Sequence, residues 1–399
     1  MNGNSPASIL LSNARVVIAE STIDAANLLI ADGRIAAILD SSEPTPNASV
    51  ILDLTGMTLF PGFIDVHIHG AVGVDTMNAA AESLHRVSAF LARNGITGWL
   101  PTLVPDSLTQ YQNATKAIDD LMANQRMDPT PGEARALGVH YEGPFVNDQQ
   151  CGALHREHFR TFRHLDDLDL IPQLRESGAT HMMTVAPEIE GGLRLIAELT
   201  KQRWVISIGH TRATGEVLAE ALNAGARHMT HFMNAMAPLQ HRAPGPVDWG
   251  LLNDEVTCDV IADGIHLDPA ILKLILRNKT SERVSLISDA IAAAGRGDGE
   301  YEIWGEKITV KNGRTQNAKG SIAGSVITML DAVRMMLSLG CSENEVAQMS
   351  AANPAHLLKI DRECGSIAAG KRADLVALDA KRQVRLTVVG GQVAFQDLS

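Results

Sequence analysis

The middle of the chain alternates short apolar runs with amphipathic segments, a pattern typical of a parallel sheet with helical connections. Eight runs have the length and composition of strands: Phe60–His69, Ile96–Val104, Ala136–Glu142, Thr180–Pro187, Trp204–His210, Arg227–His231, Val256–Asp263 and Val284–Asp289. Helical periodicity marks the segments Ala81–Asn94, Leu108–Met122, Gly192–Lys201, Ala213–Ala224 and Pro269–Asn278. Eight strands with intervening helices predict a (β/α)8 barrel of the TIM type. A doubly wound α/β sheet is the alternative that the pattern leaves open.

Short β-type runs at both ends of the chain predict a second, smaller unit. Residues 9–58 hold several such runs separated by turns, and residues 374–395 hold more, with Gly390-Gly391 as a hairpin turn. Neither end has enough strands to bury a face alone, so we expect the two ends to pair into one small β-sandwich domain. The expected domains are therefore residues 1–58 and 361–399 for the sandwich, and residues 59–360 for the barrel.

One segment after the eighth predicted strand interrupts the barrel pattern. Residues 296–319 hold two β-type runs and an Asn312-Gly313 turn, which predict a hairpin-like insert. Helical periodicity then resumes over Ser325–Leu339 and Asn344–Leu358 and returns the chain to the small domain.

Composition and charge restrict the classes of function. The 399 residues, 45% of them hydrophobic, are enough for a large core. The formal net charge of −12 argues against a nucleic-acid or anionic-membrane binder, so any anion pocket must be built locally. The four cysteines are widely scattered, which argues against a disulfide framework or a thiolate zinc site. We expect a cytoplasmic protein, since the N-terminus lacks the features of an export signal and no apolar run reaches membrane-spanning length.

Metal-competent side chains fall at the ends of the predicted strands. The residues that end the first, third, fifth, sixth and eighth strands are His67 with His69, Glu142, His210, His231 and Asp289. In a barrel of this kind the carboxyl ends of the strands open onto one face, where the active site is built. Buried imidazoles and carboxylates without partners would each cost a few kcal/mol, on the order expected for unsatisfied polar groups. The pattern therefore predicts a metal site rather than isolated structural histidines.

Imidazole and carboxylate donors suit a divalent ion such as Zn²⁺ or Fe²⁺. An open coordination position would hold a water molecule and lower its pKa toward neutrality, which makes hydrolysis the natural chemistry. Asp289 is better placed as a proton acceptor than as a ligand only, because an attacking water must lose a proton and an amine leaving group must gain one.

The chain resembles the N-acetylglucosamine-6-phosphate deacetylases of the amidohydrolase superfamily over nearly its whole length. The segments that carry the resemblance are Pro61–Gly70, His140–Phe145 with Gly152, Ala153 and His155 after it, Gly209–Thr211, Thr230–Met236, His241–Gly245, Ile261–His266, Ser288–Ala290 and Cys364–Val376. The Glu-Gly-Pro-Phe and Thr-His-x-x-Asn-Ala-Met segments are specific to this family, whereas the last segment marks amidohydrolases broadly.

For the metal, the resemblance implies one ion held by Glu142, His210 and His231. Some members of the family lack the first-strand histidines and use one ion, while others keep them and can bind two. The presence of His67 and His69 places this chain with the latter, with Glu142 then bridging the two ions.

For catalysis, the resemblance implies Asp289 as the base and then the acid. The substrate-contacting positions that it implies are Gly152, Ala153, His155, Asn234, Ala235, Arg242 and His266. The backbone at Asn234 and Ala235 and the guanidinium of Arg242 correspond to the family's phosphate site, which would supply the local cationic pocket that the net charge requires. In the family this arginine reaches the pocket of a neighbouring subunit, so a homodimer is implied.

The expected reaction is hydrolysis of the acetamide of N-acetylglucosamine 6-phosphate to glucosamine 6-phosphate and acetate, in amino-sugar catabolism and cell-wall recycling. A deacetylase of another N-acetyl hexosamine phosphate, such as the galactosamine epimer, stays open. Cyclic amidases of the superfamily usually carry a carboxylated lysine at the fourth strand's end, and Thr184–Glu188 contains none. A non-catalytic sugar-phosphate sensor is a further alternative, although such a protein would be expected to have lost a ligand or the base. Cys151 lies near the expected pocket and is assigned no role.

Overall fold

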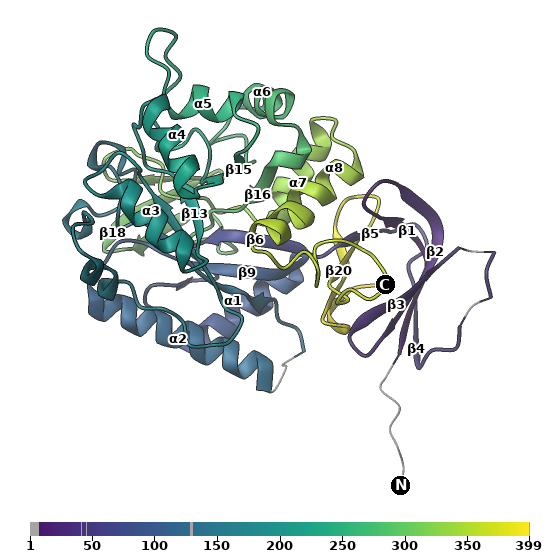
Figure 1. Cartoon of the computed structure of the whole chain (residues 1–399). Coiled ribbons are helices and arrows are strands. Elements are labelled where there is room, and N and C mark those ends of the chain that lie inside the picture. Colours follow the sequence, from purple (N-terminus) through teal and green to yellow (C-terminus); the bar gives the residue numbers. More distant parts are fainter. Residues whose placement is uncertain (1–7, 41, 45, 128–130, 399) are drawn as a thin grey trace.

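The computed structural model of the protein describes residues 8–40, 42–44, 46–127 and 131–398. Its larger part is a near-closed barrel wrapped by helices, and strands from both ends of the chain form a separate sheet beside it (Figure 1). The predicted fold class is therefore confirmed, and the doubly wound alternative is wrong. None of the helices in the described ranges combines the length and the hydropathy needed to cross a bilayer.

Eight parallel strands make up the barrel. In sheet order they are β6 (Phe63–Ile68), β9 (Ile96–Leu103), β11 (Gly138–Glu142), β12 (Thr180–Val185), β13 (Val205–Ile208), β14 (His228–Met229), β15 (Thr257–Ile261) and β16 (Val284–Ile287). The two-residue β10 (Arg135–Ala136) pairs with β9 just before β11. Beyond the end of β16, the backbone N–H of Asp289 donates to the carbonyl of His67 at 2.9 Å, which brings the last strand against the first.

Helices follow most barrel strands and supply the outer layer. They are α1 (Ala81–Arg93), α2 (Leu108–Met127), α3 (Gly192–Lys201), α4 (Gly215–Ala224), α5 (Pro246–Leu252), α6 (Pro269–Lys279), α7 (Met329–Ser338), α8 (Glu343–Ala347) and α9 (Asn353–Leu357). Gly225 ends α4, because it adopts a left-handed φ of 116° and its N–H donates to the last carbonyls of the helix. The main core lies between these helices and the strands.

The two chain ends form one mixed sheet of eight strands. Its members are β1 (Ile9–Val17), β2 (Thr22–Ala31), β3 (Arg34–Leu39), β4 (Val50–Asp53), β5 (Thr58–Pro61), β20 (Leu375–Leu378), β21 (Val384–Val389) and β22 (Gln392–Gln396). The ends meet where β5 pairs with β1 on one side and with β20 on the other. The sheet has its own apolar cluster, which includes Leu11, Leu28, Leu59 and Leu386.

The predicted strand Phe60–His69 is two strands in the structure. β5 belongs to the end sheet and β6 to the barrel, and Gly62 separates them. A Cβ at Gly62 would lie 2.2 Å from Thr97 Cγ2, so only glycine permits this close approach. The N–H of Gly62 donates to the carbonyl of Asp374 at 2.9 Å rather than to a neighbouring barrel strand.

The predicted hairpin after the eighth strand has a third strand. β17 (Gly299–Ile303), β18 (Glu306–Lys311) and β19 (Arg314–Asn317) form an antiparallel sheet, with the turn at Asn312-Gly313 as expected. We call residues 299–324 the insert. A shorter hairpin, β7 (Gly70–Ala71) with β8 (Val74–Asp75), follows His69 directly.

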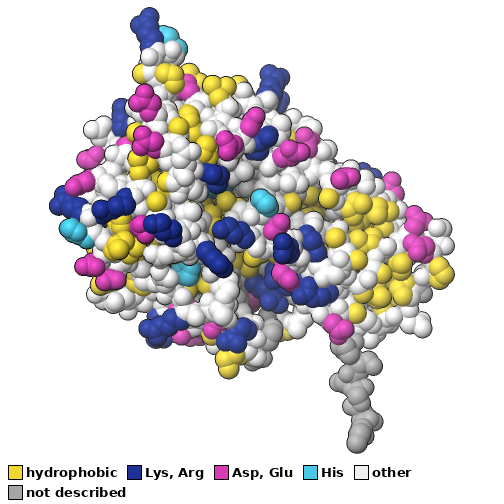
Figure 2. All heavy atoms as spheres, viewed as in Figure 1, with side chains coloured by type: hydrophobic (Ala, Val, Ile, Leu, Met, Phe, Trp, Pro, Cys, Tyr) yellow, Lys and Arg dark blue, Asp and Glu magenta, His cyan; other side chains and the backbone are white. Residues whose placement is uncertain are grey.

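Charged side chains are mixed over the visible surface. Figure 2 shows Lys and Arg side chains interspersed with Asp and Glu, so the net charge of −12 is not collected into one acidic patch on this face. The charged and ionisable side chains of the candidate site lie inside the barrel mouth, where they are buried.

Candidate active site

The structure brings the six strand-end residues together around Glu142. Its Oε1 lies 2.9 Å from Nε2 of both His210 and His231. Its Oε2 lies 3.4 Å from His69 Nε2, and His67 Nε2 is 3.7 Å from Oε1. All five side chains are buried, so the carboxylate sits in a closed ring of four imidazoles.

Two groups of donor atoms share this carboxylate. One consists of His67, His69 and Glu142, and the other of Glu142, His210 and His231, with the donor atoms of each group within 4.8 Å of one another. The Nε2 atoms are 3.1 Å apart in the first pair of histidines and 3.2 Å apart in the second. Among the described residues these are the only such groups of three or more histidine, cysteine, aspartate or glutamate donors.

The donor set fits divalent metal ions. His210 Nδ1 donates to the carbonyl of Gln150 at 2.7 Å, so in the neutral ring Nε2, which lies beside Glu142 Oε1, is the nitrogen free to bind a cation. Two acceptors 2.9 Å apart repel each other unless a cation lies between them. Among the described residues, Nδ1 of His231 and of both first-strand histidines is buried without a hydrogen-bond partner, so no neighbour at Nδ1 fixes the tautomer and each inward-facing Nε2 can act as a ligand.

When no metal ion is bound, protons would supply that positive charge. Burial lowers the pKa of His69, but hydrogen bonds to Asp289 and Glu142 outweigh burial and raise the pKa to about 10. Burial of His231 is outweighed in the same way by Glu142, and its pKa is about 9. Burial alone would raise the pKa of Glu142, yet His67 and the hydrogen bonds from the other histidines hold it well below its usual range. A metal ion must displace these protons, so metal affinity falls as the pH falls.

Three of the converging residues have a backbone conformation that is unusual for their type. His210, His231 and Asp289 have φ angles of 48°, 31° and 49°, and each lies two residues beyond the end of its strand. Left-handed φ at a non-glycine residue costs of order 1–3 kcal/mol and is retained mainly where function requires it. The strained positions thus coincide with the predicted site.

Two buried carboxylates below the donors were absent from the predicted site. Asp65 accepts a hydrogen bond from Ser288 Oγ at 2.5 Å and from the backbone N–H of His67 at 3.3 Å, and burial raises its pKa to about 7. Asp259 accepts from the backbone N–H of His231 and lies 3.0 Å from His228 Nε2. Asp65 shares the side-chain alternation of the two first-strand histidines, which was a usable signal; for Asp259 only its place in an apolar run hinted at a role.

A cavity of about 150 Å³ opens above the donors. Five of the predicted substrate positions line it, namely Gly152, Ala153, Asn234, Ala235 and His266, together with Asp289. The sequence predictions did not include four further lining residues, Leu154, Trp304, Ile322 and Gly324. His266 is held by a 2.7 Å contact between its Nδ1 and Asp263 Oδ2.

The predicted phosphate contacts differ in how they are placed. The backbone N–H of Asn234 donates to the carbonyl of His231 at 2.9 Å and is already used. The N–H of Ala235 takes part in no such bond among the described residues, so it is the open donor of the pair. Arg242 is exposed on the connection from β14 to α5, which projects beyond the barrel (Figure 1). His155 does not line the cavity, although its buried Nε2 has no hydrogen-bond partner in the part of the chain that the structure describes.

The first-strand pair decides how many ions the site can hold. We expect the double variant His67→Ala, His69→Ala to bind one equivalent of metal fewer than the wild type, because it removes two of three donors from one group and none from the other. Metal content after equilibrium dialysis measures this. If both proteins hold one ion per chain, the pair is only part of the cavity wall.

Glu188, which the sequence predictions did not assign, ties three loops together beside the donors. Its Oε1 accepts from Asn147 Nδ2 at 2.8 Å and from the backbone N–H of Arg212 at 2.6 Å. Its Oε2 accepts from Thr211 Oγ1 at 2.6 Å, and the N–H of Asn147 donates to the carbonyl of His210 at 3.0 Å. The carboxylate therefore braces the chain around His210.

We expect Glu188→Ala to weaken metal binding by roughly 10- to 100-fold, the usual range for losing a group that orients a metal ligand. The matched control is Glu188→Gln, which keeps a carbonyl oxygen for Asn147 and Arg212 and should retain most of the affinity. Metal titrations of both variants measure the difference. Equal affinity in wild type and Glu188→Ala would mean that the loop contacts do not position His210.

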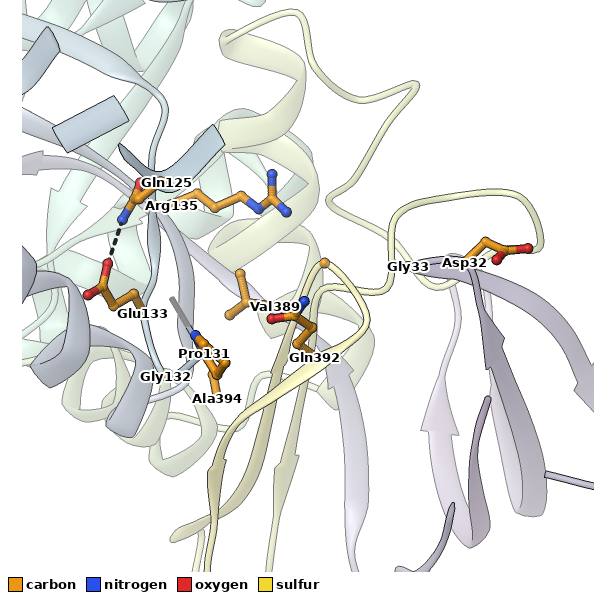
Figure 3. Close-up of a pocket in the computed structure, with 11 residues that line it drawn as sticks. Asp32, Gly33, Gln125, Pro131, Gly132, Glu133, Arg135, Val389, Gln392 and Ala394 are labelled. Carbon is orange, nitrogen blue, oxygen red and sulfur yellow. Dashed lines mark hydrogen bonds between the residues drawn. The ribbon is translucent and has the colours of Figure 1, made fainter. Parts of the chain in front are cut away.

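A separate cavity of about 300 Å³ lies between the barrel and the end sheet (Figure 3). In it Gln125 Nε2 donates to Glu133 Oε2 at 3.2 Å, while the Arg135 side chain extends away from this pair. Arg135 packs against the β21–β22 turn, where a Cβ at Gly390 would lie 2.4 Å from its Nη2. The polar groups of this cavity do not converge on a common point, in contrast to those around Glu142.

Comparison with known proteins places these features in context. The Amidohydrolase family pattern matches residues 58–394. The chain is 34% identical to the N-acetylglucosamine-6-phosphate deacetylase of Bacillus subtilis (strain 168), with 97% of each chain covered. It is 37% identical to the N-acetylgalactosamine-6-phosphate deacetylase of Escherichia coli O157:H7, with 96% of this chain and 99% of the relative covered.

The structural comparison agrees with the sequence comparison. A variant of N-acetyl-D-glucosamine-6-phosphate deacetylase from Mycobacterium smegmatis, solved in complex with N-acetyl-D-glucosamine-6-phosphate, superposes with a TM-score of 0.87 at 30% identity. The superposition covers 98% of this chain and all of the other. The two chains therefore share one fold over nearly their whole length.

Proposed function

We propose a reaction for this chain from the premise that it belongs to the amidohydrolase family and, within it, to the N-acetylglucosamine-6-phosphate deacetylases. The chain is a deacetylase of N-acetylhexosamine 6-phosphates, and its substrate is N-acetylglucosamine 6-phosphate. The products are glucosamine 6-phosphate and acetate. The cytoplasmic location expected from the sequence stays a prediction.

One observation carries this proposal. Two groups of metal donors share Glu142, the Asp289 carboxylate stands beside them, and the cavity above them is lined by five of the predicted substrate-binding residues. Asp289 Oδ1 lies 3.4 Å from His67 Nε2 and 3.2 Å from His69 Nε2, so it is at the donors without completing either group. A protein that only bound the sugar phosphate, without hydrolysing it, would need no carboxylate beside the metal donors.

Metal ions held by Glu142, His210 and His231, and by His67 and His69 with Glu142 shared, would polarise the amide carbonyl and acidify the attacking water. Asp289 accepts the proton of that water as the new C–O bond forms, and it then delivers the proton to the amide nitrogen as the C–N bond breaks. The amine leaves neutral, and the carboxylate returns to its starting state. The hydrogen bond from the backbone N–H of Asp289 to the carbonyl of His67 keeps the base beside the metal donors through both proton transfers.

The sugar epimer is the finer part of the proposal. Relatives named for the glucosamine and the galactosamine substrate are 34% and 37% identical to this chain, so identity alone does not separate them. The test is kcat/KM measured by acetate release: the proposed substrate requires the value for N-acetylglucosamine 6-phosphate to exceed that for N-acetylgalactosamine 6-phosphate. The reverse ratio would favour the galactosamine substrate, which is the second candidate.

Arg242 is proposed to bind the phosphate of a substrate held by a neighbouring copy, so the working protein is a homodimer. Arg242→Ala should raise KM for the phosphorylated substrate by about 10- to 100-fold, the effect of losing charge-assisted hydrogen bonds worth about 1.5–3 kcal/mol. Turnover of unphosphorylated N-acetylglucosamine should not change. Arg362→Ala, at another exposed arginine, is the control. Equal losses on both substrates would contradict the assignment.

A further inference from the structure

The insert forms one side of the cavity, and no step of the proposed reaction uses it. It follows the strand that carries Asp289 and packs through Ile303, Ile308 and Val310 onto Ile291, two residues beyond that base. Its position is thus fixed by the same segment that positions the base.

Trp304 brings the insert to the metal donors. It lies at the turn between β17 and β18, and its ring meets the His69 ring edge-on, with centroids 5.1 Å apart and an interplanar angle of 82°. Its φ of 52° is strained for a tryptophan, so packing must hold it there. Burial raises the pKa of the Asp75 carboxyl, and an interaction with the buried indole N–H of Trp304 opposes that larger effect by lowering the pKa. With the N–H directed at Asp75, the carbon atoms of the ring are what Trp304 contributes to the cavity lining.

Ile322 adds a second apolar side chain from the same insert. It lines the cavity with Trp304 and Gly324. Gly324 lies directly against the base, since a Cβ there would be 2.9 Å from the carbonyl oxygen of Asp289. Trp304 and Ile322 thus make an apolar wall on the side of the cavity where His69 and Asp289 stand.

The remaining lining residues face the substrate from other loops. Gly152, Ala153 and Leu154 follow β11, Asn234 and Ala235 follow β14, and His266 follows β15; under the proposed function these residues hold the sugar and its phosphate. The amide carbon bears an oxygen, a nitrogen that carries the sugar, and the acyl substituent. When the sugar lies toward these loops and the amide carbon lies at Asp289, the alkyl part of the acyl group points to the side of the cavity formed by Trp304 and Ile322.

We propose that Trp304 and Ile322 form an acyl wall that restricts the hydrolysed group to acetyl, an inference that rests on the proposed deacetylase function. Both are specificity-determining residues, because they contact the acyl chain and transfer no proton. The cavity of about 150 Å³ has little room for a longer chain behind the reacting carbon. Each added methylene should meet the indole or the isoleucine.

The test compares N-acetyl-, N-propionyl- and N-butyrylglucosamine 6-phosphate as substrates. In the wild type, kcat/KM should fall at least about tenfold for each added methylene, the lower end of what an apolar pocket discriminates. In Trp304→Ala the butyryl-to-acetyl ratio of kcat/KM should rise at least about tenfold, and metal content should stay that of the wild type. Ile322→Ala should raise the same ratio while leaving the ring contact between Trp304 and His69 in place. It replaces the tryptophan variant in the test if that variant does not fold.

Tyr301→Ala is the matched control, since Tyr301 packs in the same insert cluster but does not line the cavity. It should leave the acyl ratios unchanged. Failure of the wild type to release acetate would refute the deacetylase function itself. A wild type that hydrolyses all three substrates equally, or wall variants that slow all three by the same factor, would overturn the acyl wall while the deacetylase function stands.

Discussion

Glu142→Gln is expected to remove metal from both donor groups at once and to reduce acetate release to background. Glutamine has the shape of glutamate but no negative charge, and its amide nitrogen would be a donor facing imidazoles. Glu142 is the residue that the two groups found among the described residues have in common, so one substitution there removes a donor from both. Metal affinity should fall by more than about 100-fold, since even loss of an outer partner of a ligand costs 10- to 100-fold. Metal content after dialysis against a buffered metal solution measures it.

The same chemical change at Glu188 provides the control. Glu188→Gln alters a carboxylate in the adjoining loops but leaves every donor atom in place, so its metal content should match the wild type. If Glu142→Gln kept two ions per chain, the shared carboxylate would not be a ligand, and the donor groups would need another explanation.

Asp289→Asn is expected to leave metal bound and to lower kcat by about 10²- to 10⁴-fold, the range that a positioned acid–base group contributes. Asparagine preserves the shape of the side chain but cannot accept the water's proton. The backbone of Asp289, which donates to His67 and accepts from the N–H of Ser325 at 2.7 Å, is untouched by the change. Acetate release under saturating substrate, with metal measured on the same sample, checks both parts.

A second carboxylate in the barrel mouth makes the comparison specific. Asp263 holds His266 through a 2.7 Å contact and lies away from the donors, so Asp263→Asn should raise KM and change kcat far less. Substantial turnover in metal-loaded Asp289→Asn would show that another group moves the proton.

The sequence predicted the barrel and its mouth well because both depend on local patterns. Strand order follows chain order in a (β/α)8 barrel, so residues that end different strands, such as Glu142, His210 and Asp289, must meet at one face. Apolar periodicity therefore predicted that these side chains meet, without any knowledge of the loops. The break between β5 and β6 was missed because it depends on the contact of Gly62 with Thr97, which apolar periodicity does not encode.

The parts that were not predicted depend on how separate loops fold over one another. Glu188 is an ordinary loop carboxylate until the segments around Asn147 and Thr211 reach it. Trp304 is 235 residues from His69 in sequence number, and only the fold of the insert brings the two rings together. The backbone at Asn234 was predicted to contact the phosphate. In the structure the turn after β14 directs the N–H of Asn234 to the carbonyl of His231.

The most direct test of a metal-dependent deacetylase is acetate release from N-acetylglucosamine 6-phosphate before chelation, after chelation and after metal is restored. We predict one acetate for each glucosamine 6-phosphate formed, loss of both products after chelation, and recovery of both when Zn²⁺ or Fe²⁺ is returned. No acetate from a folded chain that holds its metal, or equal acetate from the chelated chain, would contradict the account.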